Sequence, residues 1–167
     1  MIKKIISGGQ TGADQMGLEV AQELYIKTGG TAPKGFITES GVNYALADEF
    51  NLEEITDEEN YQYCSLMNRK PDRYTGRTCM NARFSDGTVC FSSNRQSGGS
   101  KLTKAVCEHF NRPFILNPNI DSLVDFIQTN NIEVLNVAGN RASRMTQRDA
   151  DNFRTILRES LKIVNGI

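Results

Sequence analysis

The chain has 167 residues, of which 38% are hydrophobic, so it can enclose one complete core, and we expect a single domain over residues 1–167. Its 19 Lys and Arg residues are balanced by 20 Asp and Glu residues, which excludes the positive field that recruits nucleic acid nonspecifically. No apolar run of about 18 residues occurs, and Gly8 interrupts the N-terminal apolar run too early for a signal peptide, so we expect a cytoplasmic protein with no membrane partner.

In chain order, residues 2–7 are mostly apolar and predict a strand, and residues 13–27 repeat apolar side chains at helical spacing until Gly29 and Gly30, which are typical of a helix end. Between them lies Ser-Gly-Gly-Gln-Thr-Gly-Ala-Asp, residues 7–14, which we call the first glycine turn. A turn of this kind exposes the first backbone N–H groups of the following helix to an anion. Glycines at a strand end also serve tight packing, so this turn alone does not decide between the two roles.

The next segment predicts little regular structure. A short strand is expected at residues 31–32, followed by a polar stretch to residue 54 that is long for a connection in a compact domain. A helix is expected over residues 57–67, then a basic, turn-rich segment over residues 69–76 and a short helix over residues 78–84.

The C-terminal half alternates strands and helices. Residues 88–93 predict a buried strand, and Gln96-Ser97-Gly98-Gly99-Ser100, the second glycine turn, leads into a helix over residues 99–110. Strands at 113–117 and 134–138 alternate with helices at 121–130 and 146–164, for which Asp121 and Thr146 are the expected N-caps.

Such alternation implies a mostly parallel sheet covered by helices on both faces, because parallel neighbours need crossover connections. The fold class is therefore α/β, a Rossmann-like three-layer sandwich. Ligands of such folds lie beyond the carboxyl ends of the strands, where both glycine turns and the loop after Gly139 would meet.

Redox, metal and acyl-transfer chemistry have little support in the sequence. Cys64, Cys79, Cys90 and Cys107 form no C-x-x-C pair, which is typical of reduced structural thiols and unlike a zinc site. The one histidine, His109, falls at a predicted helix end and leaves no visible base for a Ser-His-Asp or Cys-His centre. We therefore expect no metal site.

The loops at the predicted crevice are instead rich in hydrogen-bond donors, which favours phosphate and ribose recognition. A loop arginine can also be simply solvated, and Asp14 could either orient a ribose hydroxyl or cap backbone groups. The residues expected to bind the ligand are Gly8, Gly9, Gln10, Thr11, Gly12, Asp14, Lys34, Arg77, Asn81, Arg95, Gly98, Gly99, Ser100, Thr103 and Arg141.

Several blocks of sequence, in order over nearly the whole chain, together resemble one family. They are residues 7–14, Pro33-Lys34-Gly35 with Glu39 and Gly41, Arg77-Thr78 with Asn81, Ser85 to Thr88, Gly98-Gly99 with Leu102-Thr103, Arg112-Pro113, and Leu135 to Gly139 with Arg141 and Ser143. In these blocks the chain resembles the putative molybdenum carrier family, which is similar to the lonely-guy (lysine-decarboxylase-like) phosphoribohydrolases and to proteins that sense nucleotide-derived ligands.

This resemblance implies a Rossmann-like fold, a crevice for a phosphorylated ligand, and a homo-oligomer, either dimer or tetramer. The family name suggests molybdenum cofactor, a pterin that bears a phosphate. The chain departs from the lonely-guy motif P-G-G-x-G-T-x-x-E, because Lys104 and Ala105 follow Thr103 and the glutamate is missing. It also has Asn140 where the family often has proline, which we expect to loosen the loop that carries Arg141.

The sequence is compatible with two functions. The first is non-catalytic binding of molybdenum cofactor or a nucleotide derivative, as a carrier or as a protein that sequesters a signal such as a cyclic ADP-ribose-type molecule. The alternative is hydrolysis of a nucleotide N-glycosidic bond, for which Asp14 or Glu39 would have to supply the carboxylate.

Overall fold

A computed structural model describes residues 1–94 and 97–167 of the chain. Its centre is a six-stranded sheet with the order β5-β2-β1-β8-β6-β7, in which every neighbouring pair is parallel. The strands are β1 (Lys4–Ile6), β2 (Lys27–Ala32), β5 (Leu52–Glu54), β6 (Gly87–Phe91), β7 (Phe114–Leu116) and β8 (Val134–Gly139). The parallel sheet predicted from the alternating pattern is therefore confirmed.

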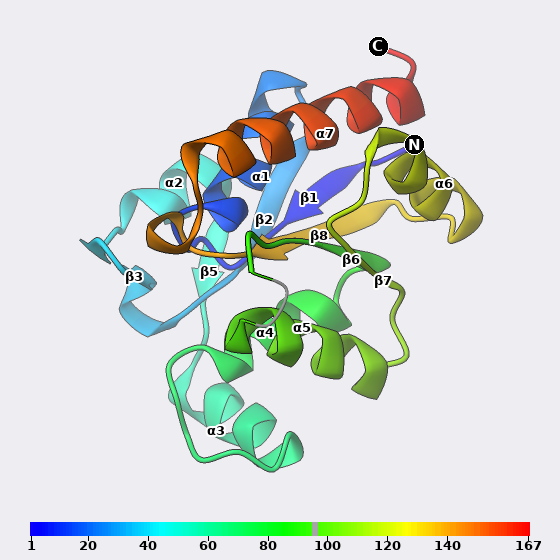
Figure 1. Cartoon of the computed structure of the whole chain (residues 1–167). Coiled ribbons are helices and arrows are strands. Elements are labelled where there is room, and N and C mark those ends of the chain that lie inside the picture. The colour runs from blue at the N-terminus through cyan, green and yellow to red at the C-terminus, as the bar shows by residue number, and fades with distance from the viewer. Residues whose placement is uncertain (95–96) are drawn as a thin grey trace.

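Helices cover both faces of this sheet (Figure 1). One face carries α1 (Ala13–Glu23), α6 (Ile120–Thr129) and α7 (Gln147–Asn165), and the other carries α4 (Thr75–Arg83) and α5 (Gly98–His109), with α3 (Asp57–Leu66) packed outside α4. This arrangement confirms the Rossmann-like three-layer sandwich.

Separate apolar clusters fill the two sides of the sheet. The larger cluster joins α1, α6 and α7 to the strands through side chains such as Leu123, Leu157 and Phe91, which are fully buried. On the opposite side, Cys79, Val106 and Cys107 are buried among α3, α4 and α5. All four cysteines are free and buried, which agrees with the expectation of reduced structural thiols.

The expected end of the first helix was wrong. The helix α1 stops at Glu23, and Gly29 and Gly30 lie inside β2 instead of ending a helix. Gly30 has φ +127°, and a Cβ there would lie 2.2 Å from the backbone oxygen of Ser7 on the neighbouring chain segment. Gly30 therefore allows a close approach of backbones in the sheet.

The polar stretch after Ala32 contains more structure than its sequence predicted. It forms a 3-10 turn η1 (Lys34–Phe36), a two-stranded hairpin of β3 (Ile37–Thr38) and β4 (Gly41–Val42), and a short helix α2 (Ala45–Phe50) before the edge strand β5. Its few apolar residues, including Phe36, Leu46 and Phe50, are buried together against α1. Such a small cluster is not visible as a periodic pattern in the sequence.

The remaining elements differ from expectation mainly at their ends. The helix expected from residue 78 begins at Thr75, and the N-cap of α6 is Asn119, which accepts from the Ser122 N–H at 2.8 Å, so the prediction of Asp121 was wrong. Thr146 caps α7 as predicted. Among the described helices, none combines the length and the apolar character needed to cross a bilayer.

Candidate functional site

A cavity of about 810 Å³ opens beyond the carboxyl ends of β1, β6 and β8. Its wall includes Gly8 and Gln10 from the first glycine turn, Gly98 and Gly99 from the second, and Arg141 from the loop after β8. The three loops therefore converge on one cavity, as the topology predicted. Helix α4 closes the remaining side with Arg77 and its neighbours.

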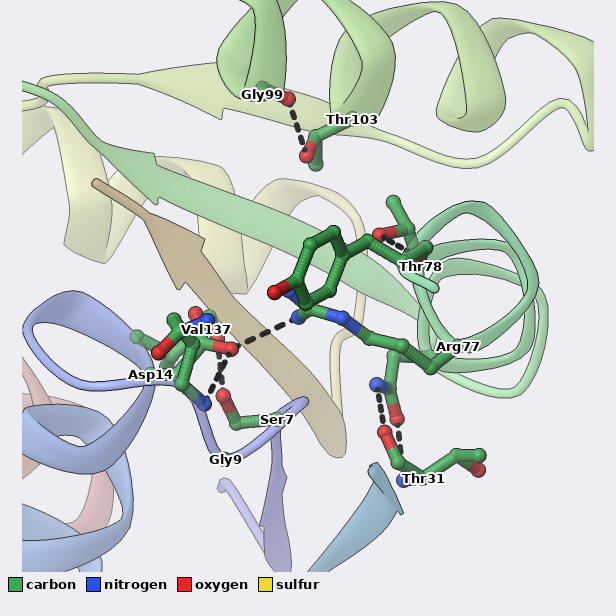
Figure 2. A network of polar contacts seen from close by, with 12 residues as sticks. Ser7, Gly9, Asp14, Thr31, Arg77, Thr78, Gly99, Thr103 and Val137 are labelled. Carbon is green, nitrogen blue, oxygen red and sulfur yellow. Dashed lines mark hydrogen bonds and ion pairs between the residues drawn. The ribbon is translucent and has the colours of Figure 1, made fainter. Parts of the chain in front are cut away.

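Asp14 and Arg77, which both line this cavity, form an ion pair (Figure 2). The Arg77 Nη1 donates to Asp14 Oδ2 at 2.9 Å, and the two side chains are 15% and 4% exposed. Burial raises the pKa of the Asp14 carboxyl above its ordinary value, while Arg77 and the N–H groups of Gln10 and Gly8 favour the charged form. The pair joins α1 to α4 and thus the two helical layers.

The backbone donors of the first glycine turn are largely used by the protein itself. The Gln10 N–H donates to Asp14 Oδ2 at 3.2 Å, and the Gly8 N–H also supports the Asp14 carboxylate. The Thr11 N–H donates to Gln10 Oε1 at 3.0 Å, and the Ala13 N–H donates to the Asn140 oxygen at 3.0 Å. The carboxylate of Asp14 therefore occupies the place that we expected for an external anion, and it caps backbone groups.

Two glycines of this turn serve packing and do not line the cavity. A Cβ on Gly9 would lie 2.7 Å from Leu52 Cδ1, and a Cβ on Gly12 would lie 2.4 Å from the backbone oxygen of Asn140. Both residues have positive φ, at 75° and 82°. The alternative reading of the glycines, close packing at a strand end, thus applies to this turn.

The second glycine turn keeps its donors open. Ser97 caps α5 by accepting from the Ser100 N–H at 3.2 Å, whereas the N–H groups of Gly98 and Gly99 have no partner among the described residues. A Cβ on either glycine would meet no atom within 4 Å. The start of α5 therefore presents two backbone donors and the positive end of a helix dipole to the cavity.

Three other predicted ligand residues are engaged within the protein. The Asn81 Oδ1 accepts from the Thr31 N–H at 2.8 Å, and the Asn81 Nδ2 donates to the Thr31 oxygen at 2.9 Å, so the amide side chain bonds to both backbone groups of Thr31. Thr103 lines the cavity but donates its hydroxyl to the Gly99 oxygen at 2.9 Å (Figure 2). Ser100 is buried, and its Oγ accepts from Ser97 Oγ at 2.8 Å.

Asn140 anchors the loops around the cavity. Its Oδ1 accepts from Ser92 Oγ at 2.9 Å, and its Nδ2 donates to Ser97 Oγ at 3.2 Å. The side chain is buried and joins the end of β8 to the cap of α5. The expectation that asparagine here loosens the loop was therefore wrong, because the amide forms bonds that a proline ring has no group to make.

Charge is distributed unevenly along the cavity wall. On the α4 side, Arg77 pairs with Asp14, and Arg69 lies 3.5 Å from Asp72. In the loop after β8, Arg141 and Arg144 line the cavity and form no ion pair with any carboxylate in residues 1–94 and 97–167, although the charge of Arg141 helps to lower the pKa of the Glu39 carboxyl. The cavity wall thus contains two arginines without an ion pair among the described residues, together with the open N–H groups of Gly98 and Gly99.

Some predicted residues lie away from the cavity. Lys34 is exposed and pairs with Asp57, and Thr11 and Glu39 bond to each other and to the loop after β8. Glu39 is also outside the wall, so of the two carboxylates considered for hydrolysis only Asp14 faces the cavity. Arg95 lies outside the residues that the structure describes.

Several residues of the wall were not among the expected ligand residues, and they include Arg69, Asp72, Tyr74, Asn136 and Arg144. Asp72 accepts from Thr75 Oγ1 and from two backbone N–H groups; although burial opposes it, these bonds hold the pKa of the Asp72 carboxyl below its ordinary value. Tyr74 has the Arg77 guanidinium 5.6 Å from its ring centre. The basic, turn-rich character of residues 69–76 was the available signal for this side of the cavity.

Within the described residues, no group of three or more His, Cys, Asp or Glu side chains is arranged to hold a metal ion. Cys90 lies under the second glycine turn, where burial raises the pKa of its thiol to about 12. This thiol is therefore protonated at neutral pH.

Comparisons with known proteins agree with the fold. The model of the family described as the circularly permutated YpsA SLOG family matches residues 5–161. The crystal structure of the putative molybdenum carrier protein from Syntrophus aciditrophicus SB is similar, with 31% identity, a TM-score of 0.71, and coverage of 98% of this chain and 94% of that chain. No curated protein matches. The resemblance drawn from the sequence blocks is thereby confirmed.

Proposed function

Because the chain belongs to the circularly permutated YpsA SLOG family, we propose that it binds a small phosphate-bearing ligand in the cavity at the strand ends and does not alter it chemically. The cavity volume of about 810 Å³ falls within the range of small-molecule sites. Its wall includes arginine and amide side chains that can donate hydrogen bonds, which suits an anionic, polar ligand.

The uneven charge of the cavity wall is the observation that carries this proposal. Arg141 and Arg144 line the cavity and form no ion pair with a carboxylate among the described residues, and the N–H groups of Gly98 and Gly99 in the same wall have no partner among those residues. We call these four residues the phosphate end of the cavity. A phosphate placed there would gain charge-assisted bonds and the helix dipole together. The first glycine turn is a poor phosphate site, because the Asp14 carboxylate would repel a second anion.

The rest of the cavity wall suits a neutral, hydrogen-bonding group. Its arginines are paired, and Tyr74, Gln10 and Asn136 contribute an aromatic ring and amide groups. A purine and a pterin are both flat nitrogen heterocycles that such groups recognise. The ligand class is therefore a phosphorylated heterocycle, either a nucleotide derivative or molybdenum cofactor as cargo, and the name of the Syntrophus protein supports the second.

The carboxylates that line the cavity already bond to other groups of the protein, which favours binding of the ligand without its hydrolysis. Asp14 is held by Arg77 and the first glycine turn, and Asp72 caps the start of α4. Glycoside hydrolysis requires a carboxylate that can approach the scissile bond and exchange a proton. Neither group is placed for this role in the present arrangement, so carriage or sequestration of the ligand is the function that we propose.

The test is to identify the bound molecule directly. We would purify the chain from cell extract, release its small molecules by denaturation and measure them by mass spectrometry, beside the variants Gly98→Val and Lys34→Ala. Gly98→Val adds a side chain at the open N–H groups, where the helix has room for it, and should lose the ligand. Lys34→Ala changes a cation outside the cavity and should retain it.

Two results would contradict the proposal. Equal amounts of ligand in the Gly98→Val variant and the wild type would place binding elsewhere. Release of free base on incubation with AMP or ADP-ribose, lost in Asp14→Asn, would show hydrolysis and replace the non-catalytic function. A phosphorylated pterin and a nucleotide differ in mass and absorbance, so the same experiment separates carrier cargo from a nucleotide signal.

A further inference from the structure

Glu39 lies in the turn of the β3–β4 hairpin, residues 37–42, which stands beside the cavity without forming its wall. Just before the hairpin, Phe36 is buried with Leu46 and Phe50 and meets the Tyr44 ring edge-on at 5.9 Å between centres. The apolar cluster therefore fixes the base of the hairpin. The tip, which carries Glu39, has a different and polar set of contacts.

The Glu39 carboxylate connects the hairpin tip to two cavity loops. Its Oε1 accepts from the Thr11 hydroxyl and from the Ser143 N–H, the latter at 3.0 Å, and its Oε2 accepts from the Ser143 hydroxyl. Thr11 Oγ1 in turn accepts from the Ala142 N–H at 3.1 Å, and the Glu39 N–H donates to Gln10 Oε1 at 2.9 Å. Partial burial opposes the charged form, but the bonds from Ser143 and Thr11 hold the pKa of Glu39 below its ordinary value.

The loop that receives these bonds, residues 141–144, carries Arg141 and Arg144. All four residues are exposed, and their local backbone bonds form a single 3-10 turn, with Arg144 N–H to the Arg141 oxygen at 2.9 Å. Short exposed turns of this kind open easily unless other contacts hold them. Glu39 and its bridge through Thr11 supply three of the contacts that tie this loop to the rest of the molecule.

We propose that Glu39 is a positioning residue that holds the loop of Arg141 and Arg144 in place at the phosphate end of the cavity, without itself touching the ligand. That the bonds from Glu39 and Thr11 order the loop follows from these contacts alone. Only the effect of this order on ligand affinity rests on the proposed function. A loop that is already ordered loses less conformational freedom when the ligand binds, which strengthens binding. The carboxylate considered in the sequence for acid catalysis thus acts through the arginines.

Limited trypsin digestion tests the positioning role without any ligand. Trypsin cleaves after arginine, so the bonds after Arg141 and Arg144 report directly on the order of the loop. In Glu39→Ala we expect cleavage there to be at least about tenfold faster than in the wild type, because local opening exposes the cleavage sites. Cleavage after Lys104, an exposed residue of α5 that is distant in sequence, should not change. Glu39→Gln keeps a carbonyl oxygen that accepts from Thr11 and the Ser143 N–H and should restore most of the protection.

Glu54→Ala is the matched control, because Glu54 Oε2 accepts from the Gly35 N–H at 2.6 Å on the same segment but does not contact the arginine loop. It should leave the two cleavage sites protected. Where Glu39→Ala lowers the melting temperature by several degrees, Ser143→Ala, which removes one donor from an exposed site, takes its place. Cleavage rates after Arg141 and Arg144 equal to the wild type in these variants, or cleavage accelerated equally after Lys104, would overturn the inference.

A binding measurement then tests the consequence. Titration calorimetry with ADP-ribose and with inorganic phosphate should show affinity about tenfold weaker in Glu39→Ala and recovered in Glu39→Gln. If the wild type binds neither probe and carries no phosphorylated ligand, the proposed function fails, while the digestion still decides whether Glu39 orders the loop. If the loop opens but affinity is unchanged, the arginines do not hold the ligand and the positioning role for binding is overturned.

Discussion

The two glycine turns of this molecule look alike in sequence but differ in what occupies them. Each follows a buried strand and begins a helix, with β1 before α1 and β6 before α5. In the first turn, the Asp14 carboxylate accepts from the Gln10 N–H, and two glycines pack against neighbouring chain segments. In the second, the Gly98 and Gly99 N–H groups have no partner among the described residues, and both Cβ positions are empty.

The comparison teaches that a glycine-rich turn before a helix can be occupied by a carboxylate of the same chain, so the sequence of the turn alone does not predict that an external anion binds there. In the first turn the chain supplies its own carboxylate one residue into the helix, and Arg77 balances the charge. After the second glycine turn, the first turn of α5 contains no acidic side chain. This contrast is why we propose the second turn, and not the first, as the site of an external phosphate.

The largest expected effect tests the internal anion of the first turn. Asp14→Ala leaves the Arg77 guanidinium without its ion-pair partner in a site that is only 15% exposed. Loss of one partner of a buried pair costs about 3 to 5 kcal/mol, and we expect a loss of that size in the free energy of unfolding from urea denaturation. The double variant Asp14→Ala with Arg77→Met should recover part of it. A loss under about 1 kcal/mol would show that the turn does not need its carboxylate.

The next largest effect compares a glycine from each turn. Gly12→Ala adds a Cβ at φ +82°, 2.4 Å from a backbone oxygen, and should lower the free energy of unfolding by about 2 to 4 kcal/mol. Gly98→Ala adds a Cβ that meets nothing within 4 Å and should raise it by up to about 0.5 kcal/mol. Thermal or urea denaturation of both variants gives the comparison. Equal losses at the two positions would mean that both turns are structural.

Arg144→Ala tests the charge at the phosphate end. Removing one unpaired cation should weaken the binding of ADP-ribose about tenfold, which corresponds to ~1.4 kcal/mol, with little change in melting temperature because the residue is exposed. The affinity of the variant should also depend less on salt concentration. Lys34→Ala, with its cation outside the cavity, is the calorimetric control. An unchanged affinity would move the phosphate away from this loop.

The smallest effect concerns Asp72 and has a defined pH dependence. The pKa of Asp72 in the folded protein is below the ordinary value of 3.8, so its stabilising bonds to the start of α4 are complete above that pH and are lost as pH falls through the folded-state pKa. Asp72→Ala should cost about 1 kcal/mol at pH 7, the usual value for a lost cap. Urea denaturation at pH 7, 5, 4 and 3 should show the difference from wild type narrowing only below about pH 4. A constant difference would exclude the charged carboxylate as the cause.

Much of this fold follows from local sequence patterns. The alternation of apolar runs and amphipathic segments after residue 87 predicted β6, α5, β7, α6, β8 and α7 to within a few residues. The region from Ala32 to Glu54 was poorly predicted, because its elements are short and bury only a few apolar side chains. Short elements depend on tertiary packing for their stability, so their own sequence carries little signal.

The sequence alone determined the class of fold, the end of the sheet where the loops meet, and the donor-rich chemistry of that place, because each depends on patterns a few residues long. Only the tertiary structure decided which donors remain open. Asp14 bonds to Arg77 and Asn81 bonds to Thr31 across long separations in the chain. The N–H groups of Gly98 and Gly99 have no partner among the described residues. A polar group forms a hydrogen bond with the partner that the fold places within about 3 Å of it, and the residues next to it in sequence do not predict which partner that is.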